Sequence, residues 1–148
     1  MDINALSVDK FDLSNVDKIV GVESMGIPLA NALSLKTDIP FVIIRKRSYG
    51  LEGEYQVHQQ TGYGKSELFI NNINENDNIL LIDDVVSTGG TLKSVIAALD
   101  DIGANLVHII LPIEKDDGKK IVEEATNKKI STLVKIKMVD GKVTIVED

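Results

Sequence analysis

The chain has 148 residues, a formal net charge of −7 and no cysteine. A chain of this length forms one domain and buries roughly 68–70% of the surface that it exposes when unfolded. The absence of cysteine excludes disulfides and thiolate metal sites and fits a reducing compartment. The acidic balance, with a pI near 4.8, disfavours a surface that binds nucleic acid. We therefore expect a single domain over residues 1–148 that binds no nucleic acid.

The start of the chain differs from a targeting segment. Residues 1–20 carry four aspartates and two lysines, so they lack the basic start and continuous apolar stretch of a signal peptide. No apolar run in the sequence approaches the length of a membrane span. We therefore expect a soluble, cytoplasmic protein with no membrane partner.

Apolar runs alternate with segments of helical period, the pattern of parallel strand–helix–strand units. The predicted strands are Lys18–Val22, Phe41–Ile44, Asn78–Ile82 and Leu106–Leu111. The first predicted helix is Ile27–Leu35. The second ends at Gly103, and its apolar stripe is Leu92, Val95, Ile96, Leu99 and Ile102. The third is Asp117–Thr126, with Ile121, Val122 and Ala125 facing inward. The pattern predicts the α/β class, with helices flanking a mostly parallel sheet.

Two regions break this alternation. The segments Thr132–Met138 and Lys142–Val146 alternate polar and apolar residues around Asp140-Gly141, which predicts a C-terminal β-hairpin. The segment Arg47–Glu67 has a weaker hairpin pattern, and its glycines and polar residues leave too little apolar surface to pack. A loop of that length inside a compact domain is usually functional or disordered.

The stretch ILLIDDVVSTGGTL, Ile79–Leu92, carries the most chemical information. Asp83 and Asp84 leave a strand at its carboxyl end, where open parallel sheets place their ligands. Two carboxylates suit a pair of sugar hydroxyls, and they also hold Mg²⁺ directly or through its water shell. The turn that follows presents N–H groups and hydroxyls at a helix N-terminus, which favours a phosphate. The residues of this candidate phosphate site are Ser87, Thr88, Gly89, Gly90 and Thr91.

Two further stretches suit an anion. Arg45, Lys46 and Arg47 are the only three successive basic residues, and in an acidic chain they point to a local anion or, alternatively, to a solvated strand end. The turn between the first strand and its helix offers backbone N–H groups, because Gly26 permits a strained, close approach. The residues of this turn are Glu23, Ser24, Met25 and Gly26, of which Met25 alternatively belongs to the core.

These stretches together resemble type I phosphoribosyltransferases. The run Asp83–Thr91 resembles their phosphoribosyl-diphosphate (PRPP) signature. Gly21–Pro28 resembles the diphosphate loop of the adenine-phosphoribosyltransferase-like branch, and Arg45–Leu68 resembles its mobile catalytic hairpin. The similarity runs from Val16 onward and is greatest to the archaeal hypoxanthine/guanine phosphoribosyltransferases. The resemblance implies a Rossmann-like fold with a mobile hairpin.

The resemblance also implies a Mg²⁺-dependent transfer of ribose 5-phosphate from PRPP to a purine base by a homodimer. Hypoxanthine or guanine is favoured, because the adenine branch commonly has an acidic residue where Gly62 stands. The segment Ser48–Gly64 is the candidate lid that keeps water from the activated sugar. The expected catalytic residues are Asp83, Asp84, Arg45 and Tyr63; Arg45 and Lys46 neutralise the diphosphate; and Val85 and Val86 line the base or fill the core. Family members usually carry a further N-terminal segment over the base, so we expect an incomplete base pocket here.

Other functions remain alternatives. A non-catalytic PRPP-binding regulator and a pyrimidine or orotate transferase would both use the same fold. The run Gly64-Lys65-Ser66 imitates a P-loop, but Gln59 stands where that pattern requires glycine and Glu67–Ile70 is a predicted strand. His58 and His108 are far apart in a chain without cysteine, which disfavours a zinc site. We expect His108 to be structural.

Overall fold

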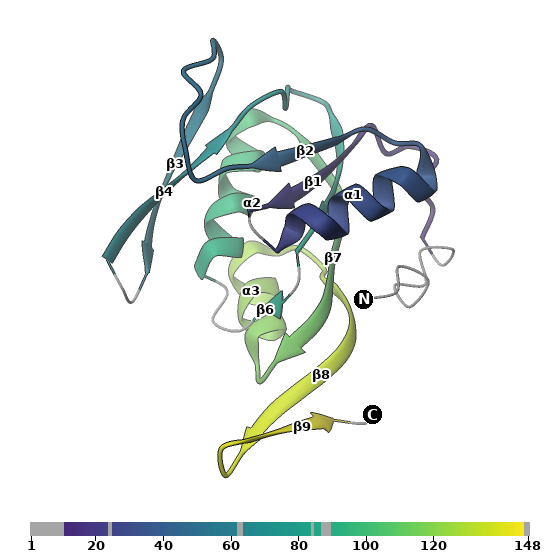
Figure 1. The fold of residues 1–148 in the computed structure, drawn as a ribbon, viewed down its shortest axis with the longest axis vertical. Helices are drawn as coiled ribbons and strands as arrows, with labels where there is room; N and C mark the ends of the chain where they lie inside the picture. The colour runs from purple at the N-terminus through teal and green to yellow at the C-terminus, as the bar shows by residue number, and fades with distance from the viewer. Residues whose placement is uncertain (1–10, 24, 62–63, 84, 87–89, 147–148) are drawn as a thin grey trace.

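The computed structural model describes residues 11–23, 25–61, 64–83, 85–86 and 90–146. Within them, helices flank a central sheet, and a separate hairpin lies at one side (Figure 1). The elements are β1 Lys18–Val22, α1 Gly26–Thr37, β2 Phe41–Ile44, β3 Tyr55–Thr61, β4 Gly64–Ile70, β5 Asn78–Ile82, β6 Val85–Val86, α2 Gly90–Ile102, β7 Asn105–Lys115, α3 Gly118–Thr126, β8 Ser131–Val139 and β9 Lys142–Val146. None of the described helices is both long and apolar enough to cross a bilayer.

The central sheet has the strand order β2-β1-β5-β7-β8-β9, and β6 pairs with β7 beside this path. All pairings are parallel except that of β8 with β9, so the predicted mostly parallel α/β sheet is confirmed. The parallel strands β2, β1 and β5 are neighbours. Their carboxyl ends therefore meet at one edge of the sheet, and the segments that follow them are brought together there.

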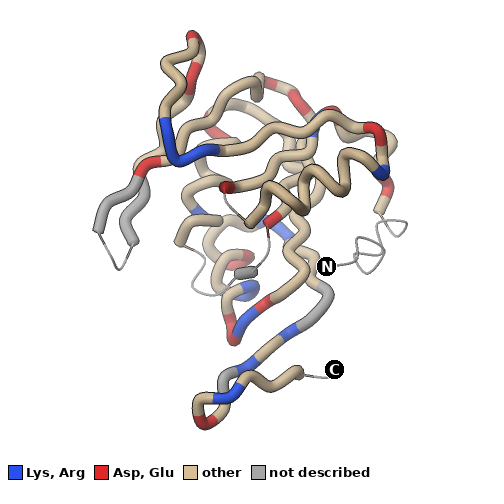
Figure 2. The backbone as a smooth tube through the Cα atoms, in the orientation of Figure 1, with Lys and Arg blue, Asp and Glu red and all other residues tan. Residues whose placement is uncertain are grey.

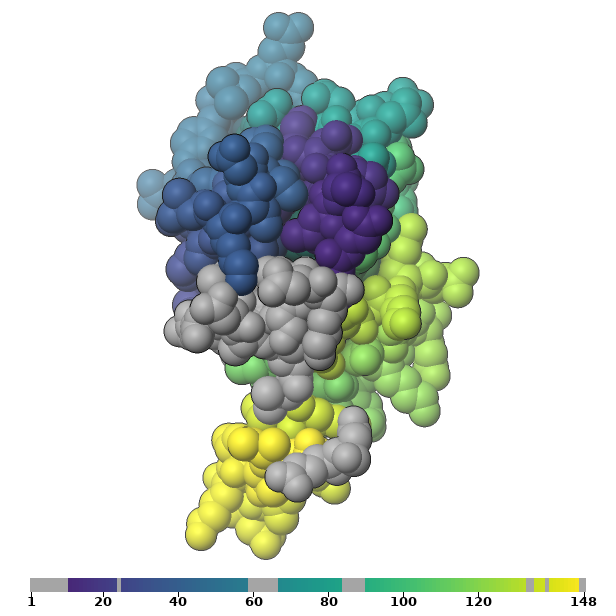
Figure 3. Space-filling model, turned by 90° about the vertical axis from the view of Figure 1, so that its right-hand side faces the viewer, coloured from purple at the N-terminus to yellow at the C-terminus, as the bar shows by residue number. Residues whose placement is uncertain are grey.

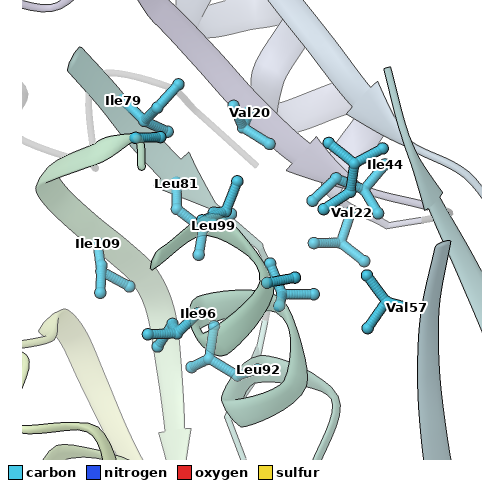
Figure 4. Packing of buried hydrophobic residues seen from close by; sticks show 14 of the residues in the cluster. Val20, Val22, Ile44, Val57, Ile79, Leu81, Leu92, Ile96, Leu99 and Ile109 are labelled. Carbon is cyan, nitrogen blue, oxygen red and sulfur yellow. The ribbon is translucent and has the colours of Figure 1, made fainter. Parts of the chain in front are cut away.

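Alternate residues of the central strands face opposite helix layers. Val20 and Leu81 belong to the core cluster that contains the apolar stripe of α2 (Figure 4). Ile19 and Leu80 belong to the second cluster, together with the buried residues of α1. Both faces of β1 and β5 are thus covered, which explains why these strands are continuous apolar runs in the sequence.

Helix α1 begins one residue before the predicted Ile27 and runs two residues beyond the predicted end. It ends at Asp38, which has φ 62° and whose N–H donates to the Ser34 carbonyl oxygen at 2.8 Å. Helix α2 ends before Gly103, at φ 90°, as predicted. A left-handed residue after the last turn satisfies carbonyl groups that the helix leaves unpaired. Strand β7 extends four residues past the predicted end at Leu111.

Helix α3 buries a narrower stripe than predicted. Val122 is fully buried, but Ile121 is 43% exposed and Ala125 is also exposed, so the prediction that all three face inward is wrong. The buried residues of α3 are Gly118 and Val122, one turn apart on a single line. A helix that contacts its neighbours along one line buries only the positions i and i+4 of that line.

The hairpin of β3 and β4 packs against the body, contrary to the prediction that it lacks the apolar surface. Val57 pairs with Leu68 across the hairpin, and their exposed fractions are only 6% and 1%. Opposite residues in an antiparallel pair point to the same face, so two isolated apolar residues combine into one contact surface. Both belong to the cluster with α2, and Figure 4 shows Val57 beside Val22.

The predicted C-terminal hairpin is confirmed. Val139 pairs with Lys142, so Asp140 and Gly141 form a two-residue turn, with φ 50° and 75°. Positive φ at both positions is characteristic of the type I′ turn that Asp-Gly favours. The hairpin projects below the rest of the molecule in Figure 3.

Candidate functional site

The β1–α1 turn lies directly against the end of β5. An ideal Cβ atom on Gly26 would lie 3.2 Å from the Ile82 carbonyl oxygen and 3.3 Å from the Gly21 Cα. Glycine at position 26 therefore permits the first turn of α1 to approach the last residue of β5. The next residue after Ile82 is Asp83, so the structure brings the predicted diphosphate turn beside the predicted sugar-binding carboxylate.

Asp83 continues the pairing of β5 with β7, because its N–H donates to the Ile110 carbonyl oxygen at 3.3 Å. The residue is half-buried at the carboxyl edge of the sheet. Gly90 and Thr91 open α2 and are also half-buried. The other predicted phosphate and catalytic residues of this segment, Asp84, Ser87, Thr88 and Gly89, lie outside the described residues, as do Ser24, Gly62 and Tyr63.

Val85 and Val86 form a short strand that was not predicted. This strand, β6, pairs in parallel with β7 at Ile113 and Glu114. It is possible because β7 runs on to Lys115 and leaves backbone groups beyond the end of β5. The two valines therefore extend the sheet between the carboxylate pair and α2; whether they line a base stays a prediction.

Glu23 links the β1–α1 turn to the end of β2. Its Oε1 accepts a hydrogen bond of 3.0 Å from the Lys46 N–H, and its own N–H donates to the Ile44 carbonyl oxygen at 2.9 Å. The Glu23 amide thus serves the sheet and is not the anion donor that the sequence suggested. Met25 is 58% exposed, which excludes its alternative assignment to the core.

The backbone of Arg45 pairs with β4, and its guanidinium group contacts an aromatic ring. Its N–H donates to the Phe69 carbonyl oxygen at 3.0 Å, and the Phe69 N–H donates back at 2.7 Å. The guanidinium carbon lies 5.3 Å from the centroid of the Tyr49 ring, within the range of a cation–π interaction. Figure 2 shows the basic stretch, residues 45–47, where β2 ends. The backbone of this basic stretch therefore lies next to the turn that Glu23 occupies, through the Lys46 N–H.

Glu54 was not singled out from the sequence, yet it binds three donors at the base of the hairpin. The Ser48 hydroxyl donates to its Oε1, while the Tyr49 N–H and the Asn71 side-chain amide each donate to its Oε2 at 3.0 Å. The hydrogen bond from Ser48, then those from Asn71 and Tyr49, lower the pKa of Glu54. A glutamate in a polar turn carries no sequence pattern that reveals such partners.

Tyr55 and the two histidines make contacts elsewhere in the fold. The Tyr55 hydroxyl donates to Asp101 on α2 at 2.9 Å. The side chain of His58 is 75% exposed and lies 3.6 Å from a carboxylate oxygen of Glu67. The His108 Nε2 lies 2.9 Å from the Asp12 carbonyl oxygen, in agreement with a structural role. The P-loop alternative is excluded, because Gly64 begins strand β4 where that motif needs a helix.

The carboxylate oxygens at this edge are hard ligands of the kind that Mg²⁺ prefers. Proteins usually hold Mg²⁺ through one or two carboxylates, with substrate phosphates and water completing the shell. Asp83 is the described carboxylate at the end of β5, and Asp84 follows it in sequence. Among the described residues, no three His, Asp or Glu side chains gather as a preformed metal cage. The chemistry of the Asp83 carboxylate therefore fits a hard divalent cation such as Mg²⁺.

Comparison with protein families gives a match to the phosphoribosyl transferase domain over residues 1–146. A protein of Methanobrevibacter ruminantium named hypoxanthine/guanine phosphoribosyltransferase is 56% identical over 96% of this chain and 76% of its own length. A protein of Methanobacterium paludis with the same name is 59% identical over 93% of this chain and 73% of its own length.

The fold is similar to that of adenine phosphoribosyltransferase from Saccharomyces cerevisiae, solved in complex with an imino-altritol bisphosphate and adenine. The TM-score is 0.76 and the identity is 26%, over 88% of this chain and 76% of that one. The match extends the resemblance from local motifs to the fold of 88% of this chain.

Proposed function

The chain belongs to the phosphoribosyl transferase domain family, and we propose on this premise that it transfers ribose 5-phosphate from PRPP to hypoxanthine or guanine. The products are the nucleoside monophosphate and diphosphate, as in purine salvage. The observation that carries the proposal is the similarity to the Methanobrevibacter ruminantium protein named hypoxanthine/guanine phosphoribosyltransferase, which is 56% identical over 96% of this chain. The adjacency of the β1–α1 turn and Asp83 supports it.

Each part of PRPP has a receptor at the carboxyl edge of the sheet. In this proposal Asp83 and Asp84 accept hydrogen bonds from the ribose hydroxyls, and the segment Ser87–Thr91 binds the 5-phosphate at the start of α2. Arg45 and Lys46 neutralise the diphosphate beside the turn that ends at Gly26. The link between Glu23 and Lys46 supports this arrangement, because it joins the turn to the end of β2.

The reaction breaks the bond between the anomeric carbon and the diphosphate while a purine nitrogen attacks. Negative charge builds on the leaving group, and Arg45 stabilises it from a fixed position. Asp83 and Asp84 would hold Mg²⁺, which would supply further charge neutralisation at the leaving group. The carboxylates bind the ribose, and the candidate lid Ser48–Gly64, which contains Tyr63, excludes water that would compete with the base.

A base panel tests the proposal. The protein is mixed with PRPP and Mg²⁺ and offered hypoxanthine, guanine, adenine, uracil or orotate, and both nucleotide and diphosphate are measured. We expect turnover with hypoxanthine or guanine, and its loss when a chelator removes the metal and its return when Mg²⁺ is restored. Turnover with orotate or uracil alone would assign the pyrimidine alternative. Binding of PRPP without turnover of any base would assign the non-catalytic one.

We also propose that the protein is a cytoplasmic homodimer, as the resemblance implies. Sedimentation at several protein concentrations measures its mass in solution. A monomer at the concentration of the activity assay would contradict the dimer and leave the proposed reaction standing.

A further inference from the structure

The segment between β2 and β3 makes an open turn. Gly50 and Gly53 have φ 63° and 83°, and no heavy atom lies within 4 Å of the Cβ that either would carry. Leu51 is 56% exposed and Tyr49 is 55% exposed, so burial contributes little to the order of this turn. A glycine-containing turn without packing has many accessible conformations, and polar contacts must select one.

The carboxylate of Glu54 makes those contacts. Its Oε1 accepts from the Ser48 hydroxyl, and that hydroxyl oxygen accepts from the Gly50 N–H at 3.0 Å. Its Oε2 accepts from the Tyr49 N–H and from the Asn71 amide, each at 3.0 Å. Asn71 directly follows β4, so one side chain joins the turn, the entry to β3 and the exit from β4.

Tyr49 links the hydrogen bonds of Glu54 to Arg45 in the candidate site. Glu54 holds the Tyr49 backbone, and the Tyr49 ring faces the Arg45 guanidinium with a separation of 5.3 Å from Cζ to centroid. The Arg45 backbone is fixed independently by its two hydrogen bonds to Phe69. The ring therefore restricts the side-chain angles of Arg45, the part of the residue that the backbone pairing leaves free.

We infer that Glu54 is a positioning residue that orients Arg45 toward the diphosphate through Tyr49. The inference rests on the proposed function, since it assumes that Arg45 meets the diphosphate of PRPP. Glu54 does not touch the substrate in this proposal. Its effect is to hold the turn so that the aromatic ring presents the guanidinium in one orientation, which reduces the entropy lost when the ligand binds.

The chemistry of the carboxylate explains why glutamate is required. An ionised carboxylate is an acceptor at both oxygens, which matches the three donors around Glu54. Glutamine has nearly the same shape but presents an NH₂ group in place of one oxygen, so at least one donor would face another donor. Glu54→Gln therefore disturbs the turn without removing bulk, and Glu52→Gln is its matched control, because Glu52 is exposed in the same turn.

Calorimetric titration with ligands that do or do not carry a diphosphate tests the inference. PRPP and inorganic diphosphate, each with Mg²⁺, depend on Arg45, whereas guanosine monophosphate lacks that group. We expect Glu54→Gln to weaken the affinity for the first two ligands about fivefold, the scale of one cation–π contact, and to leave the affinity for the monophosphate unchanged. Glu52→Gln should bind all three ligands as the unmodified protein does.

A second variant tests the route through the ring. Tyr49→Leu should weaken diphosphate binding by a similar factor, and adding Glu54→Gln to it should cause little further loss. Equal weakening of all three ligands by Glu54→Gln, or unchanged affinity for PRPP, would overturn the inference and leave the proposed function intact. Failure of the unmodified protein to bind PRPP would overturn both.

Discussion

Gly21 of β1 and Gly26 of α1 approach so closely that a Cβ atom on Gly21 would lie 2.6 Å from the Gly26 carbonyl oxygen. The same Cβ would lie 2.9 Å from the Ala30 Cβ. The strand and its helix therefore meet with no side chain between them. This contact brings the turn between them against Ile82 and hence next to Asp83, where the ligand is proposed to bind.

Gly21→Ala should lower the free energy of unfolding by about 1–3 kcal/mol, because the added methyl group meets backbone that cannot move aside. Urea denaturation measures the change. Gly90→Ala is the control for stability, since no heavy atom lies within 4 Å of the position its Cβ would take. Equal stability of the two variants would show that α1 shifts freely relative to β1.

Leu68→Ala should destabilise the whole fold by about 2–5 kcal/mol, because Leu68 is 1% exposed within the main core cluster. The measurement is the midpoint of denaturation followed by far-UV circular dichroism. Gln56→Ala, at an exposed position of β3, should change it little. A small effect of Leu68→Ala would indicate that the hairpin contributes nothing to the stability of the body.

Tyr55→Phe should loosen the hairpin from α2, because it removes the hydroxyl that donates to Asp101. This hydrogen bond raises the pKa of Tyr55, so the hydroxyl remains a donor well above neutral pH. We expect faster amide hydrogen exchange in β3, with a modest effect on the midpoint of denaturation. Asp101→Asn should cause a similar change, and the double variant should add little to either. Additive effects would contradict a direct coupling.

Asp77 should contribute to acid stability. The hydrogen bond from Lys18, at 2.8 Å, is the main cause that lowers the pKa of Asp77 from 3.8. A carboxyl group whose pKa is lower in the folded state than in the unfolded state stabilises the fold at a pH above the unfolded-state pKa. This contribution is lost as the pH falls through the folded-state pKa.

Asp77→Asn should therefore be less stable than the unmodified protein near neutral pH, and the gap should narrow as pH falls below about 3.8. Urea denaturation over a pH series measures this difference in the free energy of unfolding. Asp140→Asn is the control, because asparagine suits the exposed, positive-φ turn position equally well. A gap that is independent of pH would exclude the ion pair as its cause.

If the proposed function holds, Asp83→Asn should reduce kcat/KM for PRPP about tenfold to a hundredfold, because the amide lacks the charge with which Asp83 would hold Mg²⁺. The reduction should appear without a comparable loss of stability. Asp38→Asn, at the exposed C-cap of α1, should leave the kinetics unchanged. Unchanged kinetics in Asp83→Asn would contradict the assignment of this residue.

The central fold was predictable because its signals are local. Strands of this sheet are apolar runs, and β1, β2 and β5 have the predicted bounds. Gly103 and Asp140-Gly141 mark turns because few residues accept positive φ. The contacts that one residue makes with a distant segment leave no such mark, which is why the burial of Ile121 was predicted wrongly.

The sequence by itself determined the α/β class and the order of the elements that carry the candidate site, because both follow from periodicity and turn chemistry within short segments. Only the tertiary structure decided which of these groups meet. Glu54 and Asn71 are linked, as are Tyr55 and Asp101, because chain segments far apart in sequence pack side by side. Such contacts depend on the whole fold, so no local pattern records them.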